Sequence, residues 1–112
     1  MKKTLLENAM YYSSEAYTLY DNGEQKSLVA ATGLLAISIS FVVRHTINMY
    51  GQGSSKTKDI NSKLLELPIS FDDIVGNNGI ICMQNIETVD YNDFINTWRG
   101  LEDIIYTLSE RS

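Results

Sequence analysis

The chain has 112 residues, one histidine, one cysteine and a formal net charge of −5. This length suits one hydrophobic core, so we expect residues 1–112 to form a single domain. The lone Cys82 excludes an internal disulfide, and with a single His45 the usual cysteine–histidine zinc clusters cannot form within one chain. We therefore expect no metal and no cofactor.

The acidic charge is concentrated in the second half of the chain. Residues 1–56 contain five Lys/Arg and four Asp/Glu, whereas residues 57–112 contain four Lys/Arg and ten Asp/Glu. Phosphate binding needs a basic footprint, so we expect no direct contact with nucleic acid. The acidic half favours a basic protein partner, although ordinary solubilising surface charge gives the same pattern.

The first 20 residues predict a helix from Thr4 to Tyr20. Thr4 and Glu7 have the spacing of a capping box, and Asp21-Asn22-Gly23 supplies a stop signal. Glu7 also interrupts the apolar stretch that a signal peptide needs after Met1-Lys2-Lys3, which predicts a cytoplasmic protein. The apolar stripe of this helix is predicted to contain Leu6, Met10, Ser13, Tyr17 and Tyr20, and to be widened by Leu5, Ala9, Tyr12, Ala16 and Leu19.

A second helix is predicted over residues 24–50. Its segment Ser27 to Val43 is apolar or small on every side and approaches the length of a membrane span. Hydroxyl-bearing residues interrupt this segment, and amphipathic helices flank it, so we expect a buried central helix and no membrane.

Gly51-Gln52-Gly53-Ser54-Ser55 marks a loop, and a short helix is predicted from Lys56 to Leu67, before Pro68. The loop resembles a phosphate-binding loop, but Ser55 replaces the needed glycine and no strand precedes it. Phe71 to Val75 predicts a short turn of helix, whereas the apolar run Ile80 to Met83 fits either a turn of helix or a lone strand.

The last helix is predicted from Asp90 to Ser109, with Asp90 as its N-cap. Its apolar stripe contains Tyr91, Phe94, Ile95, Trp98, Leu101, Ile105 and Leu108. The opposite face contains Asn92, Asn96, Arg99, Asp103, Tyr106 and Glu110. The sequence therefore predicts an all-α fold, an antiparallel helical bundle with three long helices and one or two short ones.

Arg44 and His45 form an arginine–histidine pair near the end of the second predicted helix. Ala16 to Gly23, followed by the long apolar helix, resembles the first helix pair of HEPN-type proteins, in which such residues cleave RNA. That family separates the two residues along the helix, whereas Arg44 and His45 are adjacent and point about 100° apart. The resemblance implies a related antitoxin or nuclease; otherwise the two cations stabilise the end of a helix.

In size, acidity, expected cytoplasmic location and lack of a catalytic motif, the whole chain resembles bacterial immunity proteins, including those of contact-dependent inhibition systems. The resemblance implies no enzymatic activity, and a tight complex that covers the basic, substrate-binding cleft of a cognate toxin domain of nuclease type. The residues predicted to contact that partner are Asp72, Asp73, Asp93, Asp103, Tyr106 and Glu110. A third alternative is a homo-oligomeric scaffold or phage accessory protein that buries the second helix against another copy.

Overall fold

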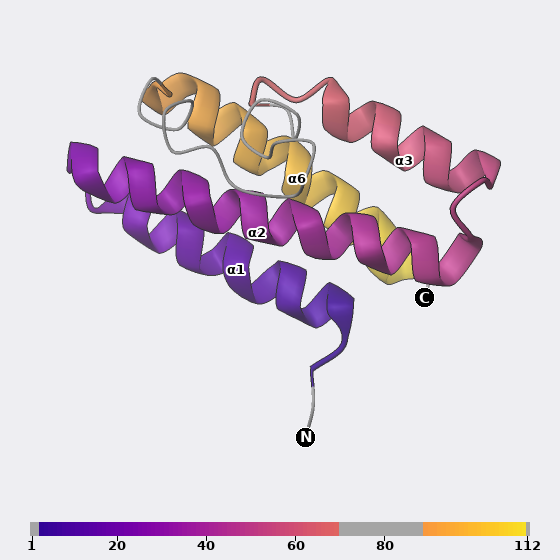
Figure 1. Ribbon diagram of the computed structural model, residues 1–112. Helices are drawn as coiled ribbons and strands as arrows, with labels where there is room; N and C mark the ends of the chain where they lie inside the picture. Colours follow the sequence, from indigo (N-terminus) through magenta and orange to yellow (C-terminus); the bar gives the residue numbers. More distant parts are fainter. Residues whose placement is uncertain (1–2, 70–88, 112) are drawn as a thin grey trace.

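The computed structural model describes residues 3–69 and 89–111, which form four helices and no strand (Figure 1). They are α1 (Leu5–Asp21), α2 (Gln25–Tyr50), α3 (Ser55–Leu65) and α6 (Tyr91–Arg111). The predicted all-α class, with three long helices and a short one, is confirmed. The predictions for the segments 71–75 and 80–83 lie outside the described residues.

Successive described helices run in opposite directions, and α2 contacts each of the other three (Figure 1). The helices α1 and α3 lie on opposite sides of α2. α6 runs roughly parallel to α2 and contacts both α1 and α3. Both α2 and α6 thus contact all three other helices, and α2 contributes more buried apolar side chains than any other described helix, as its composition predicts.

The predicted signals at both ends of α1 are confirmed. The Thr4 hydroxyl accepts from the Glu7 amide at 3.1 Å, and the Thr4 amide donates to Glu7 Oε1 at 3.4 Å. Asn22 caps the C-terminal end, and Gly23 follows with a φ of 82°, a conformation in which glycine has no steric penalty. These local contacts fix where the chain turns back to begin α2.

Side-chain caps also define the start of α3 and α6. The Ser54 hydroxyl accepts from the Thr57 amide at 3.1 Å, so α3 begins at Ser55, one residue before the predicted start. It ends at Leu65, two residues before the predicted end. For α6, the Asp93 amide donates to Asp90 Oδ1 at 2.7 Å, which confirms Asp90 as the cap.

The core forms around the buried side of α2. Its largest fully buried side chains include Leu28, Leu35 and Ile39 from α2 and Phe94 and Leu101 from α6. By length and composition alone, Lys26–Tyr50 also has the character of a membrane span, with 44% of its most apolar window buried in the bundle. The same composition suits the central helix of a folded bundle.

The predicted apolar stripe of α1 is wrong at two positions. Leu6, Ala9, Ser13 and Ala16 are the buried residues, whereas Met10 and Tyr17 are each 39% exposed. The small side chains allow α1 to approach α2 closely, and this pairing turns the larger Met10 and Tyr17 toward solvent. Helical spacing alone does not show which edge of a wide stripe faces the core.

The three hydroxyls of α2 that are fully buried donate to backbone carbonyls. The Ser38 hydroxyl donates to the Ala9 carbonyl of α1 at 2.6 Å, while Thr32 and Thr46 donate to carbonyls one turn earlier in α2. No buried side-chain polar atom of the described residues lacks a partner. The polar residues that interrupt the apolar segment are therefore compatible with its burial.

Candidate partner-binding surface

The four described residues that the sequence assigned to a partner all lie on the exposed side of α6. Asp93, Asp103 and Glu110 are exposed, and Tyr106, with 65% exposure, is the most exposed large hydrophobic side chain of the described residues. Asp72 and Asp73 lie outside the described residues. The other side of α6 contributes buried residues to the core, so the exposed side is held on a fixed helix.

Helical geometry brings three of these residues together. At about 100° per residue, Asp103, Tyr106 and Glu110 occupy a strip about 60° wide that spans two turns of α6. We call these three residues the α6 patch. Asp93 lies about 15 Å earlier along the axis and about 80° around it, in the first turn of α6. Asp93 is therefore separate from the α6 patch.

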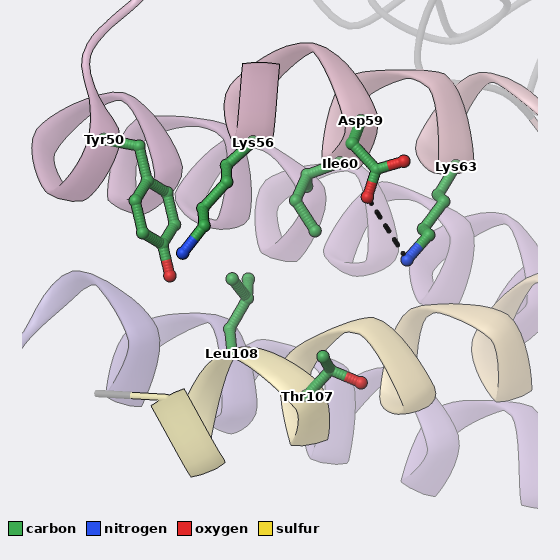
Figure 2. Close-up of a pocket in the computed structure, with 7 residues that line it drawn as sticks. All are labelled: Tyr50, Lys56, Asp59, Ile60, Lys63, Thr107 and Leu108. Atoms are coloured by element: carbon green, nitrogen blue, oxygen red, sulfur yellow. Dashed lines mark ion pairs between the residues drawn. The ribbon is translucent and has the colours of Figure 1, made fainter. Parts of the chain in front are cut away.

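One edge of the α6 patch borders a groove between α3 and α6. Figure 2 shows Lys56 and Lys63 of α3 pointing toward α6, Lys56 beside Tyr50 and Lys63 above Thr107, with Lys63 Nζ 3.5 Å from Asp59 Oδ2. An adjoining cavity of about 240 Å³ is lined by Lys63 and by Asp103 of α6. Because the groove walls hold charges of both signs, the acidic character of the α6 patch ends at α3.

The pair Arg44 and His45 is not brought into one cleft. His45 is half-buried and lines a cavity of about 310 Å³ with Glu7, Met10 and others, whereas Arg44 is exposed and does not line it. The Arg44 guanidinium carbon lies 5.3 Å from the centroid of the Phe41 ring. Burial lowers the pKa of the His45 imidazole, because the charged form loses hydration.

The interpretation that Arg44 and His45 stabilise the end of a helix is wrong. The helix α2 continues to Tyr50, and its last turn contains no basic residue. The favourable interaction of a cation with a helix dipole is confined to that last turn. Arg44 instead interacts with an aromatic ring on the surface of α2.

Contacts between α1 and α6 bring together residues that sequence analysis did not pair. The ring centroids of Tyr17 and Trp98 lie 4.7 Å apart, and Trp98 Nε1 donates to the Ser13 carbonyl at 3.0 Å. The Ser13 hydroxyl donates to Glu102 Oε1 at 2.6 Å. Tyr17 and Trp98 each stood out as members of an apolar stripe, but helical spacing does not show that the two stripes meet.

In residues 3–69 and 89–111, no group of three or more His, Cys, Asp or Glu side chains is arranged to hold a metal ion. The features of the described surface are thus the α6 patch, the groove beside it and the aromatic contacts between α1 and α6. No protein-family model, curated protein or solved structure matches the chain.

Proposed function

We propose that the chain is an inhibitor of the immunity type, which binds a basic toxin domain in the cytoplasm and covers the substrate cleft of that domain. The observation that carries this proposal is the α6 patch. Tyr106 projects from it with 65% exposure, and Asp103 and Glu110 lie about one turn before and after Tyr106.

This arrangement combines the two kinds of side chain that a tight complex with a basic partner needs. A tyrosine contributes a large contact area at a small entropic cost, which is why tyrosines are frequent among residues that dominate binding energy. The flanking carboxylates attract a cationic cleft from a distance and raise the association rate. Both kinds lie on one helix whose other side is locked in the core.

The charge of the chain agrees with this role. The net charge of −5 comes from its second half, to which α6 belongs. A nuclease cleft is positively charged because its substrate carries phosphates. A rigid acidic helix that enters such a cleft would occupy the positions of several phosphates and exclude the substrate.

The first test is co-expression of the tagged chain with the product of the neighbouring gene, followed by recovery of the complex at low and high salt. We expect one basic protein at equal stoichiometry, with its toxicity abolished. Recovery of the chain alone would contradict the proposal, and a solution mass of more than one copy would then favour the homo-oligomeric scaffold.

Variants of the α6 patch sharpen this test. We expect the double variant Asp103→Lys/Glu110→Lys to weaken binding at low salt by about 10-fold or more, and the difference to shrink as salt screens the charges. Tyr106→Ala is expected to weaken binding by about 10-fold or more at both salt concentrations. Glu15→Lys, which changes an exposed carboxylate of α1, is the matched control and should leave the affinity unchanged.

A further inference from the structure

The contacts between α1 and α6 follow a regular register. The ring centroids of Tyr20 and Phe94 are 4.9 Å apart, Tyr17 and Trp98 follow at 4.7 Å, and Ser13 bonds Glu102 at 2.6 Å. Each step moves about one turn back along α1 and one turn forward along α6, as antiparallel helices require. One more turn brings Met10 and Tyr106 to the same level.

We call the surface formed by Met10, Tyr17, Trp98, Glu102 and Tyr106 the α1–α6 seam. Three of its members are exposed large hydrophobic side chains, Met10 and Tyr17 at 39% and Tyr106 at 65%. Trp98 is half-buried between the helices, and its bond to the Ser13 carbonyl fixes the orientation of its ring. The seam therefore presents a preorganised pair of aromatic rings, Tyr17 and Trp98, at the surface.

A carboxylate lies one turn from this aromatic pair. The Ser13 hydroxyl donates a hydrogen bond to Glu102 Oε1. A carboxylate has a second oxygen that also accepts hydrogen bonds. Asp103 and Glu110 of the α6 patch bring the number of carboxylates in this part of the helix to three. The positive charge of the exposed Arg99 offsets one of these three negative charges. The seam is therefore aromatic with net negative charge.

We propose that the α1–α6 seam binds arginine side chains of the basic partner, an inference that rests on the proposed function. The guanidinium stacks on the Tyr17–Trp98 pair while its N–H groups donate to Glu102. A planar guanidinium makes both contacts at once, whereas a lysine ammonium is more strongly hydrated and has no flat face. A wholly apolar partner would strip water from Glu102 without replacing its hydrogen bonds.

Trp98 is the single tryptophan of the chain, so its fluorescence reports directly on the seam. The probe is acetyl-tetraarginine amide in low salt, and its control is the matching tetracitrulline peptide, which keeps the shape but not the charge. We expect a saturable change in Trp98 emission with the arginine peptide and none with the citrulline peptide. A change with both peptides, or with neither, overturns the proposal.

Variants assign the binding to the seam. Tyr17→Ala is expected to raise the dissociation constant for the arginine peptide by about 5-fold or more, as loss of a cation–π contact of about 1 kcal/mol predicts. Tyr11→Ala is the matched control, because Tyr11 is 46% exposed on the same helix but contacts Tyr12 and Lys3 instead. Equal weakening by both variants overturns the proposal.

Glu102→Gln provides a second test that does not depend on an aromatic truncation. The glutamine keeps an oxygen for the Ser13 hydroxyl and removes only the charge, so the fold is retained and the arginine peptide binds more weakly. Unchanged affinity for the peptide would overturn the proposal.

The affinity for the toxin separates the two proposals. If Asp103→Lys/Glu110→Lys abolishes toxin binding while Tyr17→Ala and Glu102→Gln leave it intact, the inhibitor function stands and the seam proposal fails. If no toxin partner is recovered but the arginine peptide still binds the seam as expected, the proposed function fails and the arginine chemistry of the seam stands.

Discussion

The two longest described helices, α2 and α6, each contact the other three helices but differ in the side chains that they carry. Most residues of α2 are apolar or small, and its fully buried polar residues are hydroxyls that donate to backbone carbonyls. The helix α6 has one side in the core, and its other side carries exposed charged, amide and tyrosine side chains. The buried Thr97 hydroxyl of α6 accepts a hydrogen bond from the Ile69 amide at 2.8 Å, which joins α6 to the segment that follows α3.

This difference separates residues that stabilise the fold from residues that face solvent. The buried polar groups of α2 are used within the fold, so substitutions on its inner side act mainly on the free energy of unfolding. The exposed side chains of α6 contribute little to the core, and under the proposed function they would contact the partner.

Truncation of a core residue of α2 should have the largest effect on stability. Ile39 is fully buried, and Ile39→Ala is expected to lower the free energy of unfolding by about 2–5 kcal/mol, through lost burial and a residual cavity. Asn48→Ala, at an exposed position of the same helix, is the control and should change it by less than about 0.5 kcal/mol. Urea denaturation measures both, and similar values would mean that α2 is not the centre of the core.

Loss of the hydrogen bond between α2 and α1 should have the next largest effect. Ser38→Ala removes the donor to the Ala9 carbonyl and is expected to cost about 0.5–1.5 kcal/mol. Ser40→Ala makes the same chemical change at a half-buried position of α2 and should be close to neutral. Equal costs in thermal or urea unfolding would show that the Ser38 bond contributes no net stability.

A pair of glycine substitutions compares the surroundings of the two helices. An added Cβ at Gly33 of α2 meets no atom within 4 Å, so Gly33→Ala should stabilise the fold by about 0.5–1 kcal/mol through helix propensity. At Gly100 of α6 the added Cβ would overlap Leu67 Cδ2, so Gly100→Ala should gain less or destabilise. Melting temperatures of the two variants test this order, and a larger gain at Gly100 would contradict the close approach of Leu67.

The smallest expected effect is a dependence of stability on pH. Because burial lowers the pKa of His45 in the folded chain, the unfolded chain binds a proton more readily near its ordinary pKa of about 6.5. The contribution of neutral His45 is therefore present above about pH 6.5 and is lost as the pH falls below it. Urea unfolding at several pH values measures this effect. As the pH falls below about 6.5, the free energy of unfolding should decrease more steeply for the native chain than for His45→Gln. Parallel curves for the two proteins would exclude His45 as the cause.

The helices and most of their ends follow from local sequence patterns. Capping by Thr4, Glu7 and Asp90 acts within a few residues, so their spacing along the chain was sufficient to predict it. The exposed side of α6 was likewise predicted, because its polar residues recur at a clear helical period and leave one apolar side. The exposure of Asp103, Tyr106 and Glu110 follows from that period.

The pairing of the helical faces, in contrast, depends on how the helices pack in three dimensions. Tyr17 and Trp98 are 81 positions apart, and their contact depends on how α1 packs against α2 and α6 at the same time. The same packing turned Met10 and Tyr17 outward and placed Asp103 and Lys63 along one cavity. Local periodicity specifies a range of directions for each helix face, whereas close packing between helices selects one of them.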